Sequence, residues 1–297
     1  MKNHLLFIRE NFVFSNIFVS ICALALYKVS EILLAIPINV DYSGFIFFST
    51  LSAYNFSRIP ILLHIKKHPS NLSKWIVDNK KYFIFITFFS ASKCVVYIFL
   101  LNIFFISIPI ILLSLFYSYS PLCLINYFIK NKKTKNSSSI YFSIRDLPLI
   151  KIFIISFSWT YLTIIIPAII NNLTFDFNLV CNIIVRFLFV FAITIPFDIR
   201  DLKFDKIVTI PNFIGIKNSQ IFACVCLLVC ELIIFYLYMK NNLFFSHFFS
   251  LFMTFEISSI FIFYSSKNKN DMYYSFYVEG LSILMFLVVY LSNNYIC

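Results

Sequence analysis

Residues 177–198 read FNLVCNIIVRFLFVFAITIPFD, an apolar run whose single internal charge is Arg186 and whose last residue is Asp198. A helix of about 20 apolar residues is long enough to cross the hydrocarbon core of a bilayer. Similar runs recur along the chain, and the first, from Phe12 to Ile36, is too long for the apolar part of a signal peptide and lacks a small-residue cleavage site. We therefore predict an all-α, polytopic membrane protein that keeps its first run as a span.

The composition of the whole chain supports this fold class. Of its 297 residues, 61% are hydrophobic and 12% are charged, and the mean hydropathy is +0.88. A soluble domain carries about 25% charged residues, which keep its surface hydrated. The composition therefore excludes an ordinary soluble enzyme. No polar segment is large enough for a separate soluble domain, so residues 1–297 are expected to form one transmembrane domain.

Polar breaks divide the chain into nine predicted membrane spans. Only Asn102 separates the third from the fourth, in an apolar stretch from Tyr82 to Tyr119 that is too long for one span and long enough for two short ones. A low-complexity cytoplasmic loop is expected near residues 128–140. The predicted spans are residues 12–36, 43–65, 82–101, 102–118, 149–171, 177–198, 219–239, 243–265 and 272–292.

The basic residues predict the orientation of the chain. Cytoplasmic loops of bacterial membrane proteins retain Lys and Arg, and a cytoplasmic N-terminus places most of the 24 Lys and Arg residues on the cytoplasmic side. An odd number of spans then places Cys297 outside. We expect an integral protein of the bacterial inner (cytoplasmic) membrane. This orientation explains the net charge of +11 without a nucleic-acid partner.

Three aspartates follow the sixth predicted span. If the helix continues, Asp198, Asp201 and Asp205 have i, i+3, i+7 spacing and share one face. Three carboxylates repel one another unless a divalent cation neutralises them, and Mg²⁺ prefers carboxylates together with water and phosphate oxygens. With Arg200 and Lys203 nearby, the pattern suits a Mg²⁺–diphosphate site. A solvated helix end with alternating charges is the alternative interpretation.

The same segment resembles a known family. It is similar to the second aspartate-rich motif of the UbiA-type intramembrane prenyltransferases, which have nine transmembrane helices and carry this motif after the sixth. Two further segments, residues 117–121 (YSYSP) and Tyr54-Asn55, resemble the family's YS-x-P segment and the beginning of its first motif. The residues that match the second motif are Asp198, Asp201, Asp205, Thr209, Pro211 and Gly215.

The first motif of that family, NxxxDxxxD, is incomplete in this chain. With Asn55 as its asparagine, Ile59 and Leu63 occupy the two aspartate positions. We expect Arg58, placed opposite Asp198 and Asp201, to neutralise part of the diphosphate charge, so that no second metal ion bound by first-motif aspartates is needed. The alternative is that Arg58 only anchors its helix at the cytoplasmic surface.

The resemblance implies an enzyme that transfers an alkyl group other than methyl. A prenyl diphosphate would bind with its head on Mg²⁺ and its tail in a central apolar chamber, and an aromatic or lipid-like acceptor would take the prenyl group. Asp198, Asp201 and Asp205 are then the expected catalytic residues and Mg²⁺ ligands. Asn55 would be a polar ligand that remains from the first motif.

The remaining expected roles concern the diphosphate and the acceptor. Arg58, Arg200 and Lys203 are the expected diphosphate contacts, and Tyr117 or Tyr119 is expected to line the mouth through which the acceptor enters. An aromatic residue at the membrane interface is the alternative interpretation of either tyrosine.

Two other functions are compatible with the sequence. The first is a UbiA-like scaffold or lipid-binding protein that has lost catalysis, which the incomplete first motif favours. The second is a small-molecule transporter, because ionisable residues within spans are costly unless they are paired or line a polar path. The ionisable residues within spans are Lys28, Glu31, Lys93, Arg186, Glu231, Glu256 and Glu279. Lys28 and Glu31 are expected to pair with each other.

Overall fold

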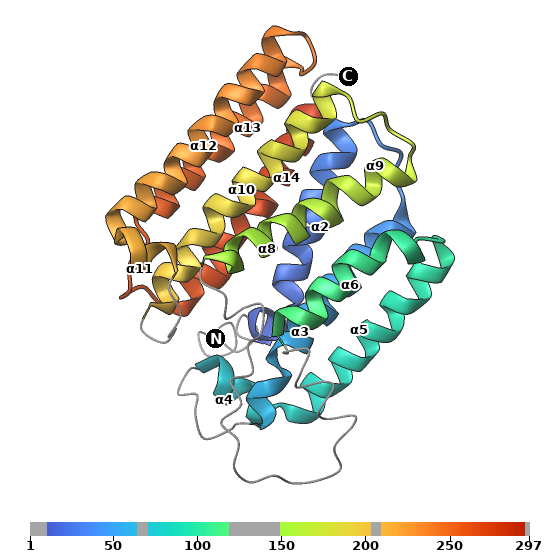
Figure 1. Ribbon diagram of the computed structural model, residues 1–297, viewed down its shortest axis with the longest axis vertical. Coiled ribbons are helices and arrows are strands. Elements are labelled where there is room, and N and C mark those ends of the chain that lie inside the picture. Colours follow the sequence, from blue (N-terminus) through green and yellow to red (C-terminus); the bar gives the residue numbers. More distant parts are fainter. Residues whose placement is uncertain (1–10, 64–70, 119–148, 203–208, 295–297) are drawn as a thin grey trace.

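The computed structural model describes residues 11–63, 71–118, 149–202 and 209–294, and within these ranges the regular structure is entirely helical (Figure 1). The low-complexity loop expected near 128–140, Met1 and Cys297 lie outside the described residues. The described helices are α2 (Ile17–Leu33), α3 (Val40–Leu63), α4 (Asn71–Asp78), α5 (Lys80–Leu100), α6 (Phe104–Ser118), α8 (Ile150–Thr160), η3 (Tyr161–Ile165), α9 (Ile166–Ile170), α10 (Phe177–Asp201), α11 (Ile210–Ile214), α12 (Ile216–Met239), α13 (Phe245–Phe263), η4 (Tyr273–Val278) and α14 (Glu279–Asn294).

Each of the nine predicted spans coincides with a helix, or with a continuous run of helical segments, in the described part of the chain. Six of these are long and apolar enough to cross a membrane, and α2, α3 and α6 are further apolar helices. Many outward-facing side chains are large and apolar, as contact with lipid requires. Examples are Phe85, Phe88, Phe105, Leu232 and Phe263, each more than half exposed. The prediction of an all-α, polytopic integral membrane protein is confirmed.

The predicted break at Asn102 is also confirmed. The α5 helix ends at Leu100 and α6 begins at Phe104, and Asn102 has a left-handed backbone with φ of 52°. Asparagine tolerates this conformation better than other residues with a Cβ atom. A three-residue connection, with Asn102 at its centre, therefore joins two apolar helices.

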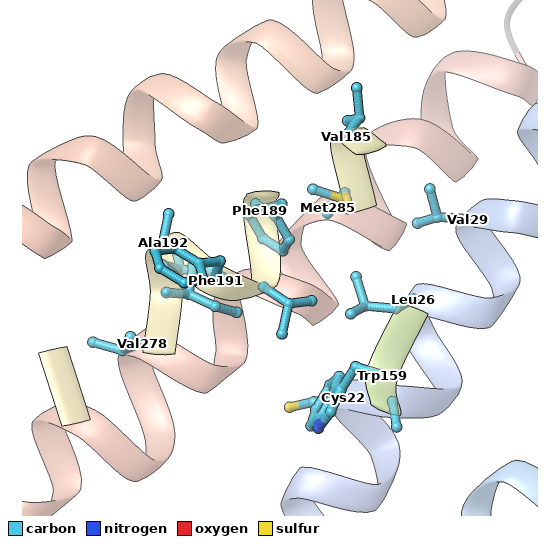
Figure 2. Packing of buried hydrophobic residues seen from close by; sticks show 14 of the residues in the cluster. Cys22, Leu26, Val29, Trp159, Val185, Phe189, Phe191, Ala192, Val278 and Met285 are labelled. Atoms are coloured by element: carbon cyan, nitrogen blue, oxygen red, sulfur yellow. The ribbon is translucent and has the colours of Figure 1, made fainter. Parts of the chain in front are cut away.

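The interior of the bundle is formed mainly by α2 and α10. The α10 helix packs between α8 and α12, while α2 packs between α14 and α3, and α5 covers α3 (Figure 1). Buried side chains of these helices form one continuous apolar cluster that extends to Trp159 of α8 (Figure 2). The α10 helix is the most buried of the six candidate spans, so the segment that ends in the predicted aspartate motif lies at the centre of the packing.

Two π-helical segments, η3 and η4, interrupt the spans that contain them. A π-turn disrupts the regular α-helical hydrogen bonds and is frequent at functional sites. In η3 the carbonyl of Leu162 accepts a hydrogen bond from the Tyr42 hydroxyl of α3 at 2.7 Å. In the second interrupted span, η4 leads directly into Glu279, the first residue of α14.

Candidate functional site

Asp198 and Asp201 lie in the last turn of α10, where a lysine from a neighbouring helix bridges them. Nζ of Lys151, in the first turn of α8, lies 3.0 Å from Oδ1 of Asp198 and 3.6 Å from Oδ2 of Asp201. Asp198 is only 1% exposed. A buried carboxylate is costly without a paired charge, so Lys151 offsets the burial of Asp198.

Arg200 holds the second carboxylate from the other side. Its Nε donates a hydrogen bond to Oδ1 of Asp201 at 2.7 Å. Its guanidinium carbon lies 5.3 Å from the ring centroid of Phe197 and 5.8 Å from that of Tyr274, within the range of cation–π attraction. The guanidinium is therefore fixed in position rather than mobile in solvent.

Arg58 of α3 and Glu279 of α14 are further charged residues that interact electrostatically at this end of the bundle. The positive charges of Arg58 and Arg200 both act on the carboxylate of Glu279, and Nη1 of Arg58 donates to the backbone carbonyl of Phe14 at 3.4 Å. Arg58 is half-buried, and both its expected role as a diphosphate contact and the alternative of a surface anchor stay predictions. Lys151 is a basic residue that bridges Asp198 and Asp201.

Asn55 is fully buried one helical turn before Arg58. Its Oδ1 accepts a hydrogen bond from Nδ2 of Asn16 at 2.7 Å, and its own Nδ2 has no hydrogen-bond partner among the described residues. A buried amide without a partner is rare in native structures and indicates that a ligand or water completes the site. Because its free group is a donor, Asn55 suits a phosphate oxygen better than a metal ion.

An apolar cavity of about 200 Å³ lies between α3, α5, α6 and α8. Phe45, Tyr54, Tyr117, Ile155 and Trp159 are among the residues that line it. Its position in the bundle suits the expected apolar chamber. Tyr117 lines it, while the expected role of Tyr117 at the acceptor mouth stays a prediction.

Two helices, α3 and α8, carry both charged residues and residues that line the cavity. On α8, Ile154 and Ile155 line the cavity one helical turn after Lys151, so their side chains lie on its face of the helix. On α3, the hydroxyl of Tyr54 accepts a hydrogen bond from the indole of Trp159 at 3.3 Å, and Tyr54 lies within the electrostatic influence of Arg58 and Glu279. Charged groups therefore adjoin one end of an apolar cavity.

Part of the predicted site is not described. Asp205, Lys203 and Tyr119 lie outside the described residues, and α10 ends at Asp201. The described ranges contain no cluster of three or more His, Cys, Asp or Glu side chains able to hold a metal ion. The three-aspartate Mg²⁺ site therefore stays a prediction.

Sequence reasoning missed Lys151 as a site residue. It is the only charged residue of the predicted span 149–171, and it lies at the same predicted side of the membrane as Asp198. A lone lysine at that end of an apolar span is the sequence feature that could have indicated its role.

The predicted pairing of Lys28 with Glu31 is confirmed by a distance of 2.7 Å between Nζ of Lys28 and Oε2 of Glu31.

No known protein family or curated protein matches the sequence. Comparison with solved structures finds a UbiA homologue from Archaeoglobus fulgidus bound to geranyl diphosphate (GPP) and Mg²⁺, with 10% identity and a TM-score of 0.64 over 95% of this chain and 99% of that one. A digeranylgeranylglyceryl phosphate synthase matches with 16% identity and a TM-score of 0.51, over 99% of this chain and 98% of that one. The chain therefore has the fold of the UbiA superfamily.

Proposed function

We propose that the protein transfers a prenyl group from a prenyl diphosphate to an apolar acceptor within the membrane. The observation that carries the proposal is the adjacency of the Lys151–Asp198–Asp201–Arg200 cluster to the apolar cavity. A polyanionic head joined to a hydrocarbon tail is the kind of ligand that such an amphipathic site accommodates. The solved UbiA homologues bound to GPP or dimethylallyl diphosphate (DMAPP), each with Mg²⁺, support this choice of ligand.

Basic side chains would bind the diphosphate. Lys151 and Arg200 are already held in position by carboxylates, so their donors need little reorganisation when an anion enters. Arg58, Lys203 and the amide of Asn55 are the further proposed contacts. These groups stabilise the negative charge that develops on the diphosphate as its bond to the prenyl carbon breaks.

Asp198 and Asp201 fit a single Mg²⁺ ion. They lie one turn apart on α10, and both are within reach of the ammonium group of Lys151, which supports a common cation position. Mg²⁺ is commonly held by one or two carboxylates plus waters and substrate phosphates, and Asp205 is the proposed third ligand. When bound there, the ion would neutralise diphosphate charge. Ile59 stands where the family's first motif has an aspartate, so the residues present favour one ion.

The cavity wall would protect the reacting prenyl group. Its apolar residues exclude water from the allylic cation that forms when the diphosphate leaves. The rings of Tyr54, Tyr117 and Trp159 line the same space and stabilise positive charge through their π faces. Tyr117, close to the end of α6, is the proposed acceptor-side residue, with Tyr119 as its expected neighbour.

Transfer is tested with labelled geranyl diphosphate, Mg²⁺ and the purified protein in detergent. Quinone, phenol and glycerol-phosphate acceptors are offered in turn, and labelled product and free diphosphate are measured. With at least one acceptor class, we expect one free diphosphate to be released for each labelled product formed. The Lys151→Met variant should form neither. Lys93→Met removes an exposed cation on the outer face of α5 and serves as the matched control.

A non-catalytic UbiA-like scaffold or lipid-binding protein is the second candidate. The salt bridges from Lys151 and Arg200 to the aspartates favour it, because cations already partly neutralise the carboxylates. This candidate predicts that geranyl diphosphate binds but is returned unchanged with every acceptor. A protein that neither binds nor turns over prenyl diphosphates of any chain length would contradict the first proposal.

A further inference from the structure

Lys93 is a charged residue on the outward face of α5, within the apolar length of that helix. It lies seven residues before the end of α5, and its side chain is exposed. Its ammonium lies 5.8 Å from the ring centroid of Phe89, one turn earlier on the same helix, and forms no salt bridge with a described residue. A charge in hydrocarbon is costly unless another charge or a polar cavity compensates it. The described part of the chain offers Lys93 no such compensation.

The hairpin of α12 and α13 carries two carboxylates within its apolar length. Glu256 is exposed on α13, Glu231 is half-buried on α12, and their negative charges act on each other. Within the described ranges, neither side chain forms a salt bridge. Two carboxylates that repel each other in hydrocarbon favour a cationic partner. This hairpin therefore presents a negative charge that lipid alone leaves unpaired.

The three charged side chains lie at similar depths. The α5 and α12 helices are four predicted spans apart, so they cross the membrane in the same direction, while α13 crosses in the opposite one. Lys93 precedes the end of α5 by seven residues, Glu231 precedes the end of α12 by eight, and Glu256 follows the start of α13 by eleven. These separations correspond to about 11, 12 and 17 Å from the same side of the bundle, and the flexible lysine side chain can span the difference.

A single copy of the chain cannot bring these charges together. The α5 helix packs against α3, α4 and α6, whereas α12 and α13 pack against each other and against α10. Figure 1 shows α5 at one edge of the bundle and the α12–α13 hairpin at the opposite edge. Any pairing of Lys93 with the two glutamates is therefore between molecules.

We propose that copies of this chain associate side by side in the membrane, with Lys93 of one copy against Glu231 and Glu256 of the next. Each contact would neutralise charges that lipid cannot solvate. Phe89 beside Lys93 and Ile260 beside Glu256 are both exposed and would pack around the pair. A second copy suits this surface because it supplies the opposite charge at the matching depth and in the same membrane orientation.

The contact joins two different faces of the molecule, so it is heterologous. Each added copy leaves one α5 face and one α12–α13 face free, and such contacts form a ring if the rotation closes or an open chain if it does not. The proposal therefore predicts oligomers larger than a dimer in crowded bilayers.

Energy transfer between donor-labelled and acceptor-labelled copies tests the contact. The purified protein, labelled at its N-terminus, is reconstituted into phosphatidylcholine vesicles, and transfer is followed as the ratio of protein to lipid is lowered. In Lys93→Gln, half-maximal transfer should need about tenfold more protein per lipid, as for loss of one polar contact between membrane helices. The Glu231→Gln, Glu256→Gln double variant should show the same loss.

A charge swap and a matched control make the test specific. Lys93→Glu should weaken association further, and combining it with Glu231→Gln and Glu256→Lys should restore association. Lys240→Gln removes an exposed cation just after α12 and should behave as the parent protein. In a large excess of detergent the copies occupy separate micelles, so removal of Lys93 should leave unfolding and geranyl diphosphate binding in detergent unchanged.

Three results would overturn the contact. The first is a parent protein whose energy transfer matches that of randomly placed molecules at every ratio of protein to lipid. The second is unchanged association in either Lys93→Gln or the double glutamate variant. The third is failure of the charge swap to restore what Lys93→Glu removes. None of these results depends on prenyl transfer, which is measured separately in detergent.

Discussion

At the residue scale, Lys151 is the side chain on which the candidate site depends most. It connects α8 to both aspartates of α10, and its side chain is 12% exposed, against 2% for Asp198. Removing one partner of a buried ion pair leaves an uncompensated charge, at a cost of about 3–5 kcal/mol. The same lysine is proposed to contact the diphosphate when substrate enters.

The first prediction is that Lys151→Met lowers the free energy of unfolding by about 3 kcal/mol and abolishes binding of geranyl diphosphate. Unfolding in mixed detergent and a filter-binding assay measure the two effects. Lys93→Met, which removes an exposed cation, should change neither. Equal behaviour of the two variants would show that the Lys151 bridge has no special role.

Single residues also show which parts of the site the sequence reveals. Asp198, Asp201 and Arg200 are close in sequence, so their spacing alone predicts a shared end of one helix. Lys151 and Glu279 reach the cluster from α8 and α14, through packing between distant segments. No local periodicity encodes such contacts, so neither residue was assigned to the site beforehand.

At the element scale, the break between α5 and α6 follows from local chemistry. The left-handed backbone of Asn102 costs other residues with a Cβ about 1–2 kcal/mol, and the cost is greatest for β-branched residues. We predict that Asn102→Val destabilises the protein by about 1–2 kcal/mol, whereas Asn102→Gly is close to neutral. Detergent unfolding measures both, and equal stabilities would contradict this account of the turn.

The π-segment η3 has no comparable sequence signal. Residues 161–165 (YLTII) are as apolar as their neighbours, so helical periodicity does not distinguish a π-turn from an α-turn there. In the structure, the Tyr42 hydroxyl of α3 donates a hydrogen bond to the backbone carbonyl of Leu162 in η3. Tertiary contact, rather than local preference, satisfies this backbone group.

We therefore predict that Tyr42→Phe destabilises the protein by about 1–3 kcal/mol, since it leaves a buried carbonyl with one partner fewer. Tyr290→Phe, at an exposed position on α14, is the matched control and should have little effect. The comparison uses unfolding temperatures in the same detergent. A smaller effect at Tyr42 than at Tyr290 would show that the contact with η3 adds no stability.

At the scale of the whole molecule, the distribution of basic residues predicts an orientation. A cytoplasmic N-terminus and an odd number of spans place the C-terminus outside. Alkaline phosphatase fused after Cys297 should therefore be active, and green fluorescent protein at the same place should not fluoresce. Fluorescence without phosphatase activity would reverse the predicted topology or change the number of spans.

The helices were predictable at this scale, while their arrangement was not. Apolar runs of bilayer length give the nine segments because the membrane fixes their length and composition. Their packing order, with α2 and α10 inside, depends on side-chain fit between distant segments. For the same reason, the cavity between α3, α5, α6 and α8 appears only in three dimensions.

The central claim is that Asp198 and Asp201 belong to a prenyl diphosphate site. Its most direct test is the thermal stability of the purified protein with geranyl diphosphate, with and without Mg²⁺, beside an Asp198→Asn, Asp201→Asn double variant. We predict a Mg²⁺-dependent stabilisation of about 2.7 kcal/mol at a hundredfold excess over the dissociation constant, absent from the variant. No stabilisation by prenyl diphosphates of any chain length, or an equal one in the variant, would contradict the account.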